Sequence, residues 1–142
     1  MGDKPPVLIG EMPGFDITSR PHLALTGQTG QRIAALAGIT WLDYLTFTDR
    51  RNVFTAPVEH WLPAQAKKNA EEMDLDGRRV VFLGDKVASA FGVKAWRNYE
   101  WHDFRGGYAA RAPHPSGRNR LFNSVAERSV FGMFMRWVIR GS

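Results

Sequence analysis

Residues 80–91 have the sequence VVFLGDKVASAF, and this stretch indicates the class of fold. Its first four residues, Val80-Val81-Phe82-Leu83, form a short continuous apolar run that is typical of a buried strand. Gly84 ends the run, and Asp85 stands where a residue that caps a helix is expected. Apolar residues then recur at helical spacing up to Gly92. The stretch therefore predicts a buried strand that leads directly into a helix.

The rest of the chain repeats this alternation. We predict further strands over residues 7–10, 50–54 and 108–112, which place Ile9, Val53, Leu83 and Ala110 on neighbouring strands. Helices are predicted over residues 31–37 and 63–73 and at the C-terminal end of the chain. The expected apolar face of that last helix consists of Val130, Phe134, Trp137 and Val138.

Two segments leave alternatives open. Residues 41–47 fit either a helix or a strand, and residues 99–104 fit an edge strand or one arm of a hairpin. The alternation of strands and helices predicts one α/β domain over residues 1–142. We expect a three-layer α/β/α sandwich around a mainly parallel, four-stranded central sheet.

The composition limits the possible functions. The chain has 142 residues, and 19 basic against 14 acidic side chains give a net charge of +5, which suits a polyanionic partner such as nucleic acid. There is no Cys, so disulfides, thiolate zinc sites and Cys-held iron–sulfur clusters are excluded. We find neither a secretory signal nor an apolar stretch of membrane-spanning length. We therefore expect a soluble cytoplasmic protein, of a bacterium or a phage, with no membrane partner.

Three chemically rich segments follow predicted strands. Gly10-Glu11-Met12-Pro13-Gly14 follows the first strand, Asn52 lies near the end of the second, and His114-Pro115-Ser116 follows the last. The carboxyl ends of parallel strands meet at one edge of a sheet, and ligands bind there. The sequence therefore predicts a ligand site built from these three segments.

These segments, in this order, resemble the signature motifs of the uracil-DNA glycosylase superfamily. The first motif is closest to the Gly-Glu-x-Pro-Gly form of the iron–sulfur-containing members. Gly27-Gln28-Thr29-Gly30-Gln31-Arg32 is similar to the Gly-x-x-Gly helix start that follows it, and Arg51-Asn52-Val53 is similar to the segment whose Asn binds uracil. The resemblance covers nearly the whole chain. It implies a protein that binds DNA, takes a base out of the helix and cleaves its N-glycosidic bond.

The resemblance also implies roles for individual residues. Glu11 is the expected carboxylate that stabilises the sugar cation or activates water, and His114 is the expected donor to the oxygen of the departing base. An amide offers both a donor and an acceptor, so Asn52 suits the base edge. The remaining base-binding residues are expected to be Gly10, Met12 and Phe15. The expected DNA-binding residues are Ser116, Arg118, Arg120 and Leu121, with Leu121 or Phe122 as the wedge that fills the gap left by the flipped base.

The chain departs from the family at several positions. Without Cys it resembles the iron–sulfur members in motif but has no ligands for their cluster. The middle of the first motif, where some members carry Asp or Asn, is Met12, so water activation falls to Glu11. Leu25 occupies the region where an aromatic residue stacks on uracil, and Phe15 is the expected substitute. No metal or organic cofactor is implied, and we expect a monomer.

Three hypotheses follow. The first is a monofunctional DNA glycosylase acting on a flipped uracil or a related deaminated or modified base, in single- or double-stranded DNA. The second is a catalytically silent module of the same fold that binds DNA or a base; Met12 and Leu25 favour it, whereas Glu11, Asn52 and His114 together oppose it. The third is an enzyme acting on free nucleosides or nucleotides. The basic segment at Arg118 and Arg120 argues against this last possibility, because a free nucleotide needs no second phosphate-binding arm.

Overall fold

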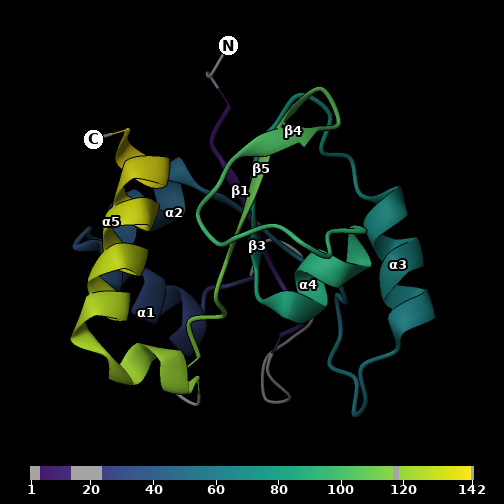
Figure 1. Ribbon diagram of the computed structural model, residues 1–142, viewed down its shortest axis with the longest axis horizontal. Helices are drawn as coiled ribbons and strands as arrows, with labels where there is room; N and C mark the ends of the chain where they lie inside the picture. Colours follow the sequence, from purple (N-terminus) through teal and green to yellow (C-terminus); the bar gives the residue numbers. More distant parts are fainter. Residues whose placement is uncertain (1–3, 14–23, 117–118, 142) are drawn as a thin grey trace.

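The computed structural model describes residues 4–13, 24–116 and 119–141, and these residues form one sheet with helices on both faces (Figure 1). The sheet has the strand order β2-β1-β3-β5-β4. Four strands run parallel, and β4 pairs with β5 in the antiparallel direction. The strands are β1 (Val7–Gly10), β2 (Asp49–Asn52), β3 (Arg79–Leu83), β4 (His102–Phe104) and β5 (Gly107–Ala112).

This sheet confirms the predicted α/β class and its mainly parallel character, but the predicted number of four strands is wrong. The fifth strand is the short β4, which forms an antiparallel arm beside β5 at the edge of the sheet. Gly106, in the turn between the two strands, has a φ of 76°, a conformation that glycine adopts readily. The edge-strand and hairpin alternatives for residues 99–104 therefore describe the same element.

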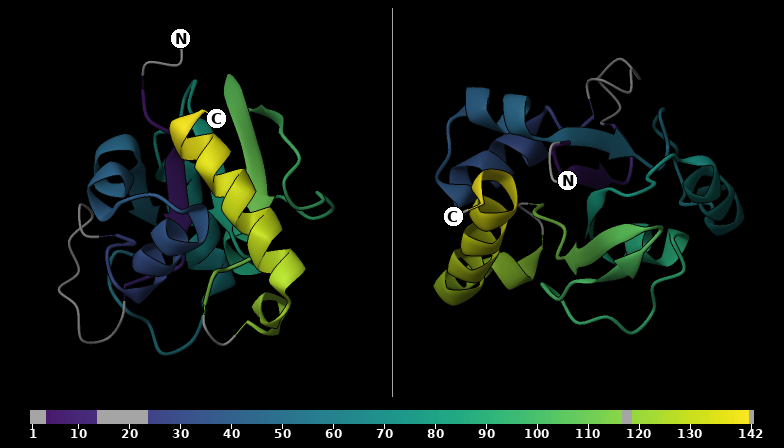
Figure 2. Two further views of the ribbon diagram at one scale, coloured as in Figure 1. Left: turned by 90° about the vertical axis from the view of Figure 1, so that its left-hand side faces the viewer. Right: turned by 90° about the horizontal axis from the view of Figure 1, so that it is seen from above.

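Helices cover the two faces of the sheet (Figures 1 and 2). One face is covered by α1 (Gln28–Ala37), α2 (Trp41–Phe47), the 3₁₀ turn η2 (Arg120–Asn123) and α5 (Val125–Arg140). The other is covered by α3 (Pro63–Glu72) and α4 (Asp85–Ala90). Successive residues of a strand point to opposite faces, so Leu8 packs against the α1–α5 side, while Val7 and Ile9 pack against the α3–α4 side.

The face of α5 predicted from the sequence is only partly right. Val138 is buried and Phe134 is half-buried, but Val130 is 46% exposed and Trp137 is 55% exposed. The helix instead approaches α1 at Gly132, where a Cβ atom would lie 2.1 Å from a backbone oxygen of α1. That close approach sets which side of the helix turns inward. The buried residues of α5 are Phe131, Gly132, Met135, Val138 and Ile139.

Two local predictions concern helix starts. Residues 41–47 form the helix α2, and the Thr40 hydroxyl caps it by accepting a hydrogen bond of 3.1 Å from the Asp43 amide. The prediction that Asp85 caps α4 is wrong. Gly84 occupies the N-cap position, and the carboxylate of Asp85, the first helical residue, pairs with Arg111 of β5.

Candidate functional site

The first two segments of the predicted site meet at the carboxyl edge of the sheet. Gly10 and Asn52 are register partners at the ends of β1 and β2. The Val53 amide, one residue past β2, donates to the Gly10 carbonyl at 3.0 Å, and the Phe54 amide donates to the Glu11 carbonyl at 2.9 Å. The two segments therefore stay paired beyond the ends of β1 and β2, and this pairing fixes the backbone of Glu11.

Gly10 provides room for side chains from two other segments. A Cβ atom on Gly10 would lie 2.7 Å from Cδ2 of Leu25 and 2.9 Å from Oδ1 of Asn52. Both side chains therefore lie against the backbone of Gly10, and the Asn52 amide reaches over β1. The glycine of the first motif thus allows an apolar side chain and an amide to sit together at the end of the strand.

Leu25 is held in place through its backbone. It has a φ of 56°, which is uncommon for a residue with a branched side chain. Its carbonyl oxygen would lie 1.8 Å from a Cβ atom on Gly30, so only glycine fits there. The hydroxyl of the fully buried Tyr44 donates to the same oxygen at 2.9 Å. The Leu25 side chain is therefore a fixed apolar wall beside Asn52.

The third segment approaches from β5, across the end of β3. The Gly84 amide donates to the Ala112 carbonyl at 2.8 Å. Gly84 has a φ of 98°, and a Cβ atom there would lie 3.1 Å from Cβ of His114. The His114 carbonyl accepts a hydrogen bond of 2.9 Å from the Asn119 side chain. His114 is thus held from both sides and reaches over the end of β3.

Glu11 and His114 are close enough to interact electrostatically. The register of β1 with β3, continued past the last pair of Ile9 and Phe82, sets Glu11 opposite Gly84. Burial lowers the pKa of the His114 imidazole below its ordinary value; the negative charge of Glu11 opposes this shift, and the positive charge of Lys86 adds to it. His114 is therefore mostly neutral at pH 7, with one ring N–H available as a donor.

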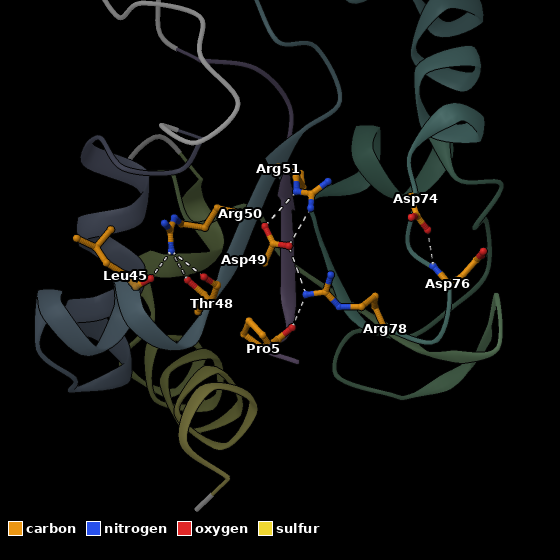
Figure 3. A network of polar contacts seen from close by, with 9 residues as sticks. All are labelled: Pro5, Leu45, Thr48, Asp49, Arg50, Arg51, Asp74, Asp76 and Arg78. Carbon is orange, nitrogen blue, oxygen red and sulfur yellow. Dashed lines mark hydrogen bonds and ion pairs between the residues drawn. The ribbon is translucent and has the colours of Figure 1, made fainter. Parts of the chain in front are cut away.

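The opposite end of β2 is fixed by a polar network (Figure 3). The Asp49 carboxylate accepts hydrogen bonds from Arg51 at 3.0 and 2.9 Å and from Arg78 at 3.3 Å. Arg50 points the other way, and its Nη1 donates to the Leu45 carbonyl at 3.1 Å and to the Thr48 carbonyl at 2.9 Å. These contacts tie the start of β2 to the end of α2 and to Arg78, the residue that precedes β3.

The structure does not bring the Met12 side chain to the Asn52 side of the site. Met12 packs against the core on the α3–α4 side, and its sulfur accepts a hydrogen bond of 3.3 Å from the Val58 amide. Its side chain is therefore used in packing. Phe15, the other apolar base-binding residue predicted beside it, lies outside the described residues.

The predicted DNA-binding residues are placed on or near the surface where the structure describes them. Ser116 is half-buried in the loop after His114, and Arg120 is exposed at the start of η2. Of the two candidate wedges, Leu121 is 38% exposed and Phe122 only 2% exposed, so only Leu121 is available at the surface. Arg118 lies outside the described residues.

Sequence reasoning missed several residues that shape the site. In the sequence Gly84 indicates only the end of a strand, although a glycine between a strand and a helix is also a signal of close backbone approach. Lys86 follows two residues later at the same sheet edge, and its ammonium lies 5.8 Å from the centre of the Trp61 ring. Tyr44 carries no signal of its role, because its contact with Leu25 joins residues 19 positions apart.

Within residues 4–13, 24–116 and 119–141, no group of three or more His, Cys, Asp or Glu side chains is arranged to hold a metal ion. None of the helices described is long and apolar enough to cross a membrane. No protein-family model matches the chain, and neither does any curated protein.

Proposed function

We propose that the chain is a monofunctional DNA glycosylase that hydrolyses the N-glycosidic bond of a flipped uracil, or of a related deaminated or modified base, and leaves an abasic site. One observation carries the proposal. A carboxylate, an amide and an imidazole, on Glu11, Asn52 and His114, follow strands that end at the carboxyl edge of a parallel sheet, and the charge of Glu11 acts on His114. These three groups match the demands of this bond cleavage.

The chemistry needs stabilisation at both ends of the breaking bond. As the bond between C1′ and the base nitrogen breaks, its electron pair leaves with the base and positive charge develops on the sugar. The carboxylate of Glu11 stabilises that charge and orients the attacking water. The neutral His114 donates its N–H to the oxygen on which the negative charge of the base develops. Water supplies a hydroxyl group to C1′ and a proton to the base.

Base recognition falls to the other half of the site. The Asn52 amide has a donor and an acceptor for the base edge, and Oδ1 lies beside Gly10. Leu25 gives the base an apolar wall, although a weaker one than the aromatic ring that the family resemblance implies at this position. We propose that the base enters between this wall and His114.

DNA binding is the part of the proposal that involves the surface. The net charge of +5 favours a polyanion, and the segment after His114 places the exposed Arg120 and Leu121 next to the site. In this role Arg120 neutralises a phosphate, Ser116 hydrogen-bonds another, and Leu121 fills the space left by the flipped base.

One observation favours a second candidate function, a module of the same fold that binds DNA or a base without cleaving it. The middle position of the first motif carries Met12, and its side chain is engaged by the core. If Glu11 alone does not activate water, the site binds a base and does nothing further.

The experiment uses labelled single- and double-stranded oligonucleotides that each carry one uracil, hypoxanthine, xanthine or hydroxymethyluracil, with alkali to reveal abasic sites. We expect strand cleavage with at least one of these bases. Loss of one oxyanion donor lowers the rate by a factor of about 10² to 10³, so His114→Ala should slow single-turnover cleavage by that order. Glu11→Ala should also slow it, and Asn52→Asp should weaken uracil recognition.

Two outcomes would decide against parts of the proposal. If the wild-type protein cleaves none of the oligonucleotides but binds them, the binding module replaces the glycosylase. If it cleaves and His114→Ala is as fast as the wild type, the role given to His114 is wrong. Arg140→Gln, at the far end of α5, serves as the control for an unrelated surface change.

A further inference from the structure

A small pocket lies between the first turn of α1 and the loop that follows His114. Its volume is about 240 Å³, and its lining residues are Gln28, Thr29, Arg32, Pro115 and Ser116. These residues offer a guanidinium, an amide and two hydroxyl groups, and no carboxylate is among them. A pocket with this lining favours a ligand that is negatively charged and rich in hydrogen-bond acceptors.

Arg32 is the cation of this pocket, and no protein carboxylate neutralises it among the described residues. Its guanidinium lies 5.8 Å from the centre of the ring of Phe122, a buried residue of η2. Its Nε is buried without a hydrogen-bond partner. An arginine that lines a pocket and is packed on a ring is prepared to bind an anion with little loss of side-chain freedom.

The pocket is close to the proposed catalytic residues. Ser116 lies two residues after His114, and two residues span at most about 7 Å of chain. The α1 side of the pocket also begins directly after Leu25, Thr26 and Gly27, the segment that brings the apolar wall to Asn52. An anion bound here would therefore be a near neighbour of a base bound between Asn52 and His114.

We propose that this pocket binds a DNA phosphate group that flanks the flipped nucleotide, with Arg32 as its cationic ligand. The inference rests on the proposed function in one respect, because that function places the target nucleotide beside the pocket. It adds a residue from α1 to the DNA-binding surface, which otherwise consists of the segment after His114. The phosphate would then be held between α1 and the start of that segment.

The test measures DNA binding and needs no cleavage. Affinity for a uracil-containing oligonucleotide is measured over a range of salt concentrations for the wild type, Arg32→Gln and Arg136→Gln. Each phosphate contact contributes about 0.7 to 0.9 to the slope of log affinity against log salt. Arg32→Gln should lower the magnitude of the slope by about that amount. Arg136 belongs to α5 and donates to the Gly38 carbonyl at the other end of α1. Arg136→Gln therefore removes the same charge far from the pocket and should leave the slope unchanged.

A second probe carries an uncharged methylphosphonate in place of the phosphate on either side of the uracil. With the correct phosphate neutralised, Arg32→Gln should weaken binding no further, because the two changes remove the same contact. Arg32→Lys keeps the charge and should keep the salt slope of the wild type. If Arg32→Gln does not fold, the salt slope of Arg32→Lys is compared between the charged and the methylphosphonate probes. Equal slopes on the two probes would overturn the proposal.

The remaining outcomes separate this inference from the proposed function. An unchanged slope for Arg32→Gln, an equal fall for Arg136→Gln, or independent effects of the variant and the methylphosphonate would each overturn it, as would a wild-type protein that does not bind the probes. If the wild type binds but does not cleave, and Arg32→Gln lowers the slope, the phosphate site stands while the glycosylase activity does not.

Discussion

Replacement of Gly84 by alanine should show how the end of β3 positions His114. Gly84 has a φ of 98° and a ψ of 166°, a backbone region that is almost exclusive to glycine. Holding another residue there costs about 1–3 kcal/mol. The new Cβ atom would also lie 3.1 Å from Cβ of His114, so the histidine must give way. Together we expect a loss of about 2–3 kcal/mol in the free energy of unfolding.

Gly92→Ala is the matched control. Gly92 lies just past the other end of α4, has a φ of 81°, and has no atom within 4 Å of the position of a Cβ. Its replacement should therefore cost only the backbone strain, about 1–2 kcal/mol. It should leave His114 undisturbed, so the pair of variants separates the strain at a positive φ from the displacement of the histidine.

Urea unfolding and titration of His114 by NMR give the two readouts. Gly84→Ala should lower the free energy of unfolding by about 2–3 kcal/mol. It should also move the pKa of His114 back toward its ordinary value, because a displaced imidazole is less buried. Gly92→Ala should not move that pKa. The reasoning is refuted if Gly84→Ala costs less than about 0.5 kcal/mol, the usual effect of a neutral surface change, or if both variants shift the His114 pKa equally.

Three further predictions concern stability. Because burial lowers the pKa of His114 in the folded state, its contribution to stability is fully present above about pH 6.5 and is lost as the pH falls through the folded-state value. The free energy of unfolding of the wild type should therefore fall relative to that of His114→Asn on acidification, and an equal pH dependence of the two proteins in urea unfolding would contradict this. Tyr44→Phe leaves the Leu25 carbonyl without its donor and should lower the free energy of unfolding by about 1–3 kcal/mol, with faster amide hydrogen exchange around Leu25. An unchanged free energy of unfolding would show that this hydrogen bond contributes nothing to stability. Burial alone would raise the pKa of Asp49, but its arginine partners outweigh burial and the net pKa is lowered. Asp49→Asn should therefore lower the free energy of unfolding by about 1.5–3 kcal/mol at pH 7 and by less near pH 3. An equal effect at both pH values would argue against the ion pairs.

The strands and most helices were predictable because their signals are local. The apolar runs of β1 and β3, the end of α1 at Ala37 and the start of α3 at Pro63 depend on residues that are neighbours in sequence. The start of α1 was not predicted correctly, because the helix begins at Gln28, three residues before the predicted start. The inward face of α5 was not predictable, because its residues 130–139, VFGMFMRWVI, are apolar on nearly every side of the helix. Helical periodicity therefore cannot identify the buried side. Contact with α1 at Gly132 makes the choice, and that contact joins distant parts of the chain.

The candidate site divides in the same way. That Glu11, Asn52 and His114 lie at one edge follows from the alternation of strands and helices, because parallel strands end together. The contacts that hold these three residues in place do not follow from this alternation. Gly30 and Tyr44 act on Leu25, and Gly84 acts on His114, through tertiary contacts that have no local pattern. The prediction that Asp85 caps α4 was wrong for a related reason, since the carboxylate of Asp85 pairs with Arg111 of β5, which is distant in sequence.

Two glycines set where the amide of Asn52 and the imidazole of His114 lie at the carboxyl edge of the sheet. Asn52 ends β2 and His114 follows β5, and these strands are three places apart in the sheet, which corresponds to about 14 Å between their backbones. The Asn52 amide, however, lies over Gly10 on β1, and His114 lies over Gly84 at the end of β3. Since β1 and β3 are adjacent, the amide and the imidazole approach the ends of neighbouring strands. A side chain at either glycine would push its neighbour outward, so the separation of the amide from the imidazole depends on the absence of two Cβ atoms.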